Sequence, residues 1–263
     1  MATSPGRYTT QLQAGLGLAP ETRTLLELWT PGMSAARLYA VALDSGRFPT
    51  VTARRLRNIV VECFAPRYLI NRGAPAAHLQ PLGPWLPAAE FNQFLLLFTS
   101  RAHPILGDFI RQVYWARYAG RYSEIGNDDA RAFVARAIDD GLTLKHWSEN
   151  TVRRVSAYLT GCCADYGLLE AGRKSRRRIL PFRLSCRLAA YLAYDLHFAG
   201  GGDNALLNHP DWGLFGLGRE DVLEEMKKLS LQGLLIVQAV GDVIRISWKY
   251  PNLETLCDVL ARG

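Results

Sequence analysis

Residues 34–64 read SAARLYAVALDSGRFPTVTARRLRNIVVECF, and this stretch decides the fold. Ser34 can cap a first helix that runs to about Ser45. Thr52 can cap a second helix that runs to Phe64, and the apolar residues of this second helix repeat at the helical period. Two short helices joined by a tight turn are typical of a helix-turn-helix. The sequence therefore predicts such a motif, and an ordinary helical hairpin is the alternative.

The second of these helices carries polar residues away from its apolar stripe. Arg54 and Asn58 lie opposite the stripe, and Arg55 and Arg57 flank it. In a major groove, Arg54 and Asn58 would face base edges, where Arg reads guanine and Asn reads adenine. Arg55 and Arg57 would then face the phosphate backbone. These residue types indicate DNA binding, and the alternative is a helix whose arginines are simply solvated.

Helical patterns continue through most of the chain, and they predict a mainly α, compact multi-helix fold. The further helices are expected at 20–29, 88–100, 105–121, 128–140, 148–165, 185–198, 218–232 and 252–261. Residues 71–89 are rich in Pro and Gly, so we expect a linker without continuous secondary structure there. Near the C-terminus, 234–239 and 243–248 are β-prone, with Gly241-Asp242 at the turn. A helix followed by a hairpin is the layout of a winged-helix module. Residues 168–185 could hold a short hairpin or an extended arm.

These patterns divide the chain into three regions that we expect to form one compact body. Residues 1–72 form an N-terminal helical region with the first helix-turn-helix. Residues 88–198 form a central helical region with a second helix-turn-helix and a basic arm. Residues 203–263 form the winged-helix-like region.

Composition narrows the class of partner. The 263 residues carry a formal net charge of +7, with a sequence pI near 9.3. A basic excess makes nucleic acid the first candidate partner and a membrane surface the second. The most apolar stretch, FLLLF at 94–98, is far shorter than the ~20 residues of a membrane span. With no signal peptide at the N-terminus, we expect a cytoplasmic protein without a membrane partner.

A run of basic residues follows the expected helix at 148–165. Its members, which have no acidic residue among them, are Arg173, Lys174, Arg176, Arg177, Arg178 and Arg183. Such a cluster repels itself unless counter-charges are near, and phosphates would supply them. A solvated loop, or a loop paired with acidic helices elsewhere, is the alternative. Arg153 and Arg154 lie off the apolar stripe of the preceding helix, so this helix and the arm could form a second DNA-binding module.

Two other helices suggest different partners. The helix near 109–122 interleaves Tyr114, Tyr118 and Tyr122 with arginines, which suits a stacking surface for single strands. The same spacing suits a core helix whose arginines reach solvent, and we favour the core interpretation. The helix at 218–232 has more acidic than basic residues. We therefore expect it to serve packing or protein contact rather than DNA.

No catalytic, metal or cofactor signature is found. The chain lacks a phosphate-binding Gly-Lys-Ser/Thr loop and a complete dinucleotide fingerprint. Its five cysteines are scattered and its five histidines are isolated, so neither a disulfide framework nor a metal site is expected. We expect a protein that is not an enzyme and that needs no cofactor.

Several segments together resemble the BrxA family. They are Tyr8–Leu18 (YTTQLQAGLGL), Glu21–Leu28, Ala53–Leu69 (ARRLRNIVVECFAPRYL) and Ser148–Ser185, which contains Gly167-Leu168-Leu169, the basic stretch and Ile179-Leu180-Pro181. BrxA is a small core component of the BREX phage-defence systems. The resemblance implies a mainly helical protein with helix-turn-helix motifs that binds DNA without known enzymatic activity. It carries a DNA-binding role onto the basic positions of the matching segments: Arg54, Arg55, Arg57, Arg153, Arg154 and the 173–178 cluster.

The residues and the resemblance lead to one preferred hypothesis. It is a monomeric, non-enzymatic accessory protein of a BREX system that binds double-stranded DNA and other BREX proteins. One alternative is a protein–protein adaptor that uses the acidic C-terminal helix and the hairpin. A second alternative is RNA binding through the aromatic and basic helix near 109–122.

Overall fold

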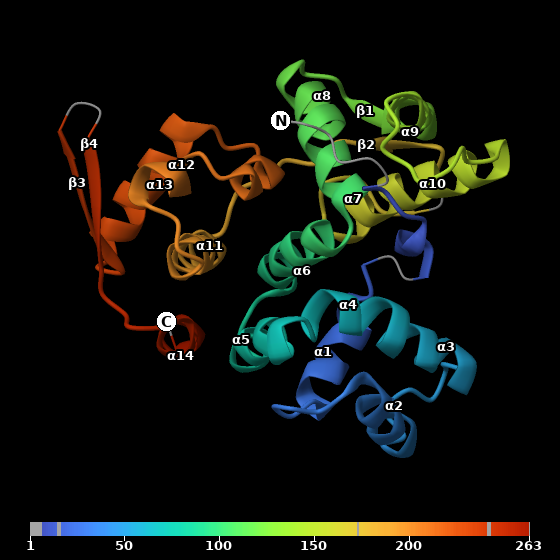
Figure 1. Cartoon of the computed structure of the whole chain (residues 1–263), viewed down its shortest axis with the longest axis horizontal. Helices are drawn as coiled ribbons and strands as arrows, with labels where there is room; N and C mark the ends of the chain where they lie inside the picture. Colours follow the sequence, from blue (N-terminus) through green and yellow to red (C-terminus); the bar gives the residue numbers. More distant parts are fainter. Residues whose placement is uncertain (1–6, 15–16, 173, 241–242, 263) are drawn as a thin grey trace. The chain divides into compact units, whose positions relative to one another are not determined.

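The computed structural model describes residues 7–14, 17–172, 174–240 and 243–262, and this part of the chain is mainly helical (Figure 1). Its β structure consists of two antiparallel pairs of strands. The predicted fold class is therefore confirmed. The chain divides into two compact units: unit 1 comprises Met1–Ala77 and Leu95–Phe182, and unit 2 comprises His78–Phe94 and Arg183–Gly263. None of the helices within the described ranges is both long enough and apolar enough to cross a membrane.

Unit 1 begins with a group of short helices (lower part of Figure 1). They are η1 (Gln11–Ala14), α1 (Ala19–Leu28), α2 (Ala35–Asp44), α3 (Ala53–Asn58), η2 (Ile59–Phe64), α4 (Ala65–Tyr68) and η3 (Asn71–Gly73). Both predicted caps are present. The Ser34 hydroxyl accepts a hydrogen bond from the Arg37 N–H at 3.3 Å, and the Thr52 hydroxyl accepts one from the Arg55 N–H at 3.3 Å. Each bond satisfies a backbone donor that has no partner within the helix.

The helix predicted from Thr52 to Phe64 continues to Tyr68, and its middle part, η2, is a π-helix. In this wider turn the Ala65 N–H donates to the carbonyl of Val60, five residues back. Pro66 follows directly. Proline lacks an N–H and its ring clashes with the carbonyl four residues earlier, so a widened turn lets the helix pass through it.

The expectation of a structureless segment at 71–89 is wrong, because α5 spans Ala74–Leu82. Pro75 lies in the first turn of α5, where its missing N–H costs nothing. Pro81 lies in the last turn. Proline content alone therefore overestimates the interruption of helical structure, since each proline occupies a position near a helix end.

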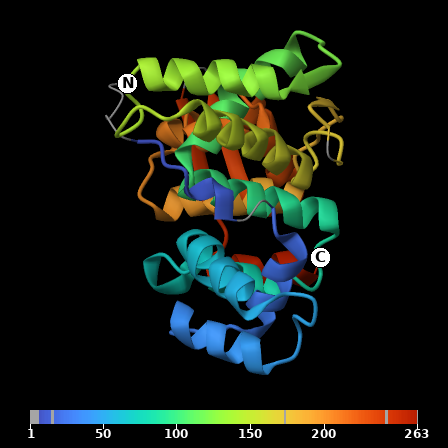
Figure 2. The same cartoon turned by 90° about the vertical axis from the view of Figure 1, so that its right-hand side faces the viewer.

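The rest of unit 1 combines helices with a small two-stranded sheet. The elements are the end of α6 (Ala88–Ala102), α7 (Pro104–Phe109), the π-helix η4 (Ile110–Tyr114), α8 (Trp115–Ala119), β1 (Glu124–Gly126), α9 (Asn127–Asp139), α10 (Glu149–Asp165) and β2 (Arg176–Arg178). Helices α9 and α10 pack against each other (Figure 2). The buried faces of α9 and α10 include Phe133, Val134, Val155 and Leu159. These are the apolar positions that set the helical period of the two segments.

Polar side chains are also buried in the core of unit 1. The Thr99 hydroxyl and the Tyr166 hydroxyl lie 2.7 Å apart and share a hydrogen bond. His103 is 3% exposed, and burial together with the nearby Arg67 charge lowers its pKa to about 4. The imidazole is therefore neutral at pH 7.

Unit 2 contains the helix and hairpin that the sequence predicts. Its elements are α11 (Cys186–Phe198), α12 (Asp203–Leu207), η5 (Pro210–Phe215), α13 (Arg219–Leu231), β3 (Leu235–Val240), β4 (Val243–Trp248) and α14 (Leu253–Arg262). Leu235 pairs with Trp248 and Val237 with Ile246 across the hairpin. The predicted turn at Gly241-Asp242 lies outside the described residues. The short elements α12 and η5 were not predicted.

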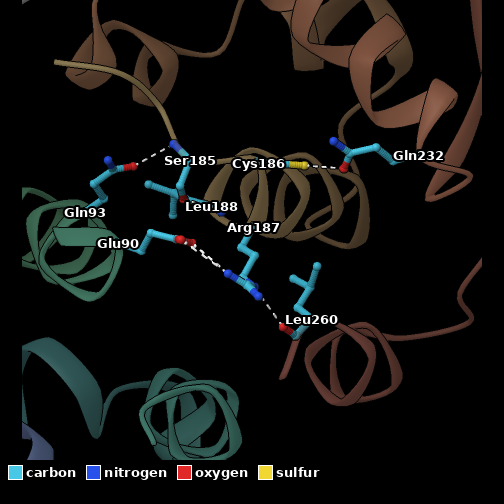
Figure 3. Close-up of polar contacts among 8 residues, drawn as sticks. All are labelled: Glu90, Gln93, Ser185, Cys186, Arg187, Leu188, Gln232 and Leu260. Atoms are coloured by element: carbon cyan, nitrogen blue, oxygen red, sulfur yellow. Dashed lines mark hydrogen bonds and ion pairs between the residues drawn. The ribbon is translucent and has the colours of Figure 1, made fainter. Parts of the chain in front are cut away.

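Arg187 on α11 ties several elements of unit 2 together (Figure 3). Its guanidinium lies 3.3 Å from both carboxylate oxygens of Glu90 and donates to the Leu260 carbonyl at 3.0 Å. Nearby, the Ser185 N–H donates to the Gln93 side chain at 2.9 Å, and the Cys186 thiol donates to the Gln232 side chain. The beginning of α6, the start of α11 and the end of α14 are thus joined by polar contacts.

Candidate nucleic-acid interface

Helix α3 presents its arginines to solvent. Arg54, Arg55 and Arg57 are exposed and Asn58 is half-buried, while Leu56 between them is buried. Within the described part of the chain, no carboxylate lies within ion-pair distance of Arg54 or Arg57. Residues 45–61 contain no Asp or Glu at all. This helix therefore offers a concentrated positive charge to an anionic partner.

The connection between α2 and α3 is longer than a tight turn. It spans residues 45–52, whereas a helix-turn-helix commonly has a turn of three or four residues. The Tyr39 hydroxyl of α2 donates to the Ala53 carbonyl at 3.4 Å and thereby links the two helices. The two predicted helices and their caps are confirmed, and the helix-turn-helix interpretation stays a prediction.

Helix α10 carries the second pair of predicted residues. The Ser148 hydroxyl accepts from the Thr151 N–H at 3.4 Å and caps the helix. Arg153 and Arg154 are both exposed within the first two turns. Arg153 donates to the Asn150 side chain at 2.8 Å, which orients it along the helix surface. Both arginines remain at the surface of unit 1, the unit that also contains α3.

The basic arm is folded back as a short hairpin rather than extended. The Glu170 N–H donates to the Arg178 carbonyl and the Leu180 N–H to the Leu168 carbonyl. Strand β2 of the arm pairs with β1, so that Arg178 faces Glu124 in register and Arg176 faces Gly126. One predicted residue, Arg173, lies outside the described residues.

Glu170 supplies a counter-charge for the arm that the sequence interpretation overlooked. Its carboxylate lies 3.0 Å from the Lys174 ammonium and 3.6 Å from the Arg178 guanidinium. The hydrogen bond from Lys174 and the charges of Lys174 and Arg178 lower the pKa of Glu170. The run of basic residues has no acid within it, but an acid stands four residues before Lys174, at ion-pair spacing.

The four described basic residues of the 173–178 cluster have different surroundings. Arg177 is half-buried and donates to the backbone carbonyls of Glu170 and Gly172, so it holds the hairpin together. Arg176 lines a polar pocket of about 330 Å³ that also contains Asp128 and Asp129. Lys174, Arg176 and Arg178 are all exposed, and Lys174 and Arg178 are partly neutralised by Glu170.

The aromatic helix near 109–122 only partly follows the core interpretation. Tyr114 is fully buried, and its hydroxyl donates to the Leu180 carbonyl at 3.4 Å. Tyr118 and Tyr122, by contrast, are exposed. The helix ends at Ala119 and Arg121 has a φ of +57°, so the four-residue spacing no longer places Tyr122 on the same face. The Arg117 guanidinium lies 4.3 Å from the Tyr122 ring centre and also pairs with Asp129.

The two units differ in net charge. Unit 1 contains 23 Lys and Arg against 13 Asp and Glu, a net charge of +10. Unit 2 contains 8 Lys and Arg against 11 Asp and Glu, a net charge of −3. All eleven predicted DNA-contacting residues belong to unit 1. On α13 of unit 2, Lys227 and Lys228 pair with Glu224 and Glu225, each at 2.6 Å.

The sequence predicts no metal centre, and the His, Cys, Asp and Glu side chains of the described residues bear on this prediction. No group of three or more His, Cys, Asp and Glu in these ranges is arranged to hold a metal ion. Each of the five cysteines is a free thiol. Burial raises the pKa of the Cys63 thiol, and it raises that of Cys162 to about 12, so both are neutral at pH 7.

Comparison with known proteins identifies relatives of most of the chain. A family model described as BrxA matches residues 6–195. Among solved structures, the chain is similar to the crystal structure of an uncharacterized protein from Magnetospirillum magneticum. That similarity has a TM-score of 0.57 at 15% sequence identity and covers 73% of this chain and 95% of that chain, so it shows a related fold. The chain has no match among curated proteins.

Proposed function

This chain belongs to the BrxA family, and we propose that it is a double-stranded DNA-binding accessory protein of a BREX phage-defence system. In this proposal it has no catalytic step of its own. The observation that carries the proposal is α3, a capped helix with three exposed arginines in a stretch that has no acidic residue. The net charge of +10 on the unit that holds α3 would draw DNA toward it.

The proposed contacts divide by role. Helix α3 would enter the major groove, with Arg54 and Asn58 toward base edges and Arg57 toward a phosphate. Arg153 and Arg154 of α10 would contact phosphates. Phosphate contacts fix the position of a protein on DNA but carry no sequence information. Binding should therefore be strongly salt-dependent and weakly sequence-selective.

The arm would contribute less than its composition indicates. Arg177 donates hydrogen bonds to backbone carbonyls of its own hairpin. The Glu170 carboxylate partly neutralises Lys174 and Arg178. A phosphate could replace Glu170 at these two cations, because both are exposed. We propose Lys174 and Arg178 as the phosphate contacts of the arm.

Binding of the full chain to a labelled ~30-base-pair duplex at several salt concentrations tests the proposal. The protein is purified free of nucleic acid first. The logarithm of the association constant should fall linearly with the logarithm of salt concentration, with a slope of about 0.9 per phosphate contact. Lys174→Glu with Arg178→Glu should weaken binding to every duplex equally. Absence of binding at low salt would overturn the proposal.

The assay also separates RNA from DNA. Single-stranded RNA is added as a competitor of the labelled duplex. We expect unlabelled duplex DNA to displace the labelled duplex more strongly than the RNA does, because the exposed arginines of α3 suit the major groove of DNA. If the RNA competes more strongly, and Tyr118→Ala or Tyr122→Ala weakens its binding, the α8 region binds RNA and the proposed function is wrong.

A protein adaptor is the second candidate, and unit 2 favours it. This unit is acidic overall, and Leu231 at the end of α13 is 90% exposed. Ile236 on β3 is also exposed. The family match ends at residue 195, so α12, α13, the hairpin and α14 lie beyond it. Co-purification with other defence proteins after nuclease treatment, lost on Leu231→Glu, would support this role.

A further inference from the structure

Unit 1 contains an apolar groove whose lining residues include none of the proposed DNA contacts. It has a volume of about 520 Å³ and lies between the α1–α2 connection and the end of α4. Trp29, Met33, Leu69 and Ile70 provide most of its apolar wall. Arg72 is the one charged residue among those that line it. Grooves of this size and character, with few polar groups among apolar ones, are typical of binding sites.

The segments that build the groove contain no acidic residue. Residues 28–43 and 63–89 have neither Asp nor Glu, although they contain Arg37, Arg67 and Arg72. Arg72 is exposed at the rim, and Ile70 beside it is 42% exposed. The charge that complements this groove is therefore negative, and the surface that complements it is apolar.

The backbone at the rim adopts an unusual conformation. Asn71, Arg72 and Gly73 have φ values of +49°, +59° and +85° in succession. Left-handed backbone is costly for non-glycine residues and persists where the surroundings fix it. Position 73 requires glycine because of close packing as well: a Cβ there would lie 2.6 Å from the Trp29 ring. Gly73, which follows Arg72, is thus packed directly against Trp29 of the groove wall.

We propose that this groove binds a segment of a partner protein that inserts one large apolar side chain and places an adjacent carboxylate on Arg72. The apolar wall would bury the inserted side chain, and Arg72 would pair with the carboxylate. A DNA backbone fits this surface poorly, since phosphates need several donors and the groove offers mainly apolar side chains. The net charge of +10 on unit 1 would favour the approach of an acidic partner.

Three matched synthetic dodecapeptides, each labelled with fluorescein, test the proposal against the full chain. The first has a central Leu-Trp pair flanked by Glu, the second has Gln in place of Glu, and the third has Ala-Ala in place of Leu-Trp. Fluorescence anisotropy should show binding of the first peptide at least tenfold tighter than that of either control. Equal binding of the first and third peptides would mean non-specific charge attraction and would overturn the proposal.

Variants of the groove locate the binding. Ile70→Glu and Arg72→Glu change exposed side chains, so the fold should survive, and each should weaken binding of the first peptide at least tenfold. Arg72→Gly should remove binding while the thermal midpoint stays at or above that of the wild type, because glycine accepts the left-handed backbone. Arg54→Gln on α3 is the matched control and should leave peptide binding unchanged.

The same variants separate this proposal from the proposed DNA contacts. Ile70→Glu should leave the affinity for the labelled duplex within twofold of the wild-type value. If Ile70→Glu weakens duplex binding tenfold, or if the duplex displaces the peptide from wild-type protein but not from the Arg54→Gln control, the groove belongs to the nucleic-acid surface. The partner-protein proposal is then wrong, whatever the outcome for α3.

Discussion

Unit 1 and unit 2 are built alike and charged oppositely. Both are mainly helical, and both begin key helices with hydroxyl caps, Thr52 for α3 and Ser185 for α11. Unit 1 nevertheless has a net charge of +10 and unit 2 one of −3. Helix followed by hairpin in unit 2 has the layout associated with DNA binding, but its charge does not suit a polyanion. The comparison shows that two mainly helical units of one chain can carry opposite net charge, a property that bears on the kind of partner each could bind.

Helices α3 and α13 make this contrast local. Arg54 and Arg57 of α3 stand in a stretch without acids, whereas Lys227 and Lys228 of α13 each pair with a glutamate three residues earlier. An exposed cation that already has a counter-charge gains less from a phosphate, because the existing pair must be broken. The free energy that a basic residue gains from contact with a phosphate therefore depends on whether an acidic neighbour already pairs with it.

The largest expected effect comes from reversing the charge of α3. We expect Arg54→Glu, Arg55→Glu and Arg57→Glu together to weaken binding of the full chain to duplex DNA on the order of a thousandfold, because attraction becomes repulsion at each contact. The slope of affinity against salt should fall as well. The matched control in unit 2, Lys227→Glu with Lys228→Glu, should leave the affinity within twofold. Equal losses from both sets, with folding verified by circular dichroism, would remove the distinction between the units.

The two units also differ in how they bury histidine. In unit 1, burial lowers the pKa of His103 to about 4, against about 6.5 in an unfolded chain. Above pH 6.5 the imidazole is neutral in both states. As pH falls toward 4 the unfolded state takes up the proton first, so the free energy of unfolding decreases by up to about 3 kcal/mol. Urea unfolding between pH 7 and pH 4 should show this loss, and His103→Gln should remove that share of it.

His78 in unit 2 is the comparison for this pH dependence. Burial lowers its pKa too, but the Glu254 carboxylate, 3.6 Å away, opposes the shift. His78→Gln should therefore reduce the pH dependence of unfolding less than His103→Gln does. A larger reduction from His78→Gln would mean that the Glu254 carboxylate does not offset burial, and the contrast between the two histidines would fail.

The sequence predicts local structure well where a cap and an apolar period coincide. Ser34, Thr52 and Ser148 each cap a helix that follows them, as the sequence indicates. It fails where position within a helix outweighs composition, as at Pro75 in the first turn of α5. The assembly of the candidate site was harder to predict, because β2 pairs with β1 through residues that are fifty or more positions apart in the sequence. The groove at Arg72 was missed because the sequence places it in an apparent linker.

A smaller effect is expected from Arg187, which joins α11 to Glu90 and Leu260 in unit 2. Arg187→Met should lower the free energy of unfolding by about 1–2 kcal/mol, because it leaves a partly buried carboxylate and a carbonyl without their donor. Lys228→Met breaks an exposed pair with Glu225 and should cost less than about 0.5 kcal/mol. Urea unfolding at pH 7 measures both. Similar costs for the two variants would show that Arg187 is no more important than a surface lysine.

The smallest effects come from the two hydroxyl caps, and they separate stability from binding. Thr52→Ala and Ser185→Ala each remove one acceptor for a helix N–H, so each should lower the free energy of unfolding by about 1 kcal/mol. Only Thr52→Ala should also weaken DNA binding, by a few-fold, since fraying of the first turn of α3 displaces Arg54 and Arg55. Urea unfolding and duplex titration measure the two effects. If Thr52→Ala lowers stability but not affinity, the first turn of α3 does not touch DNA, and the contact must begin at Arg57 or lie on α10.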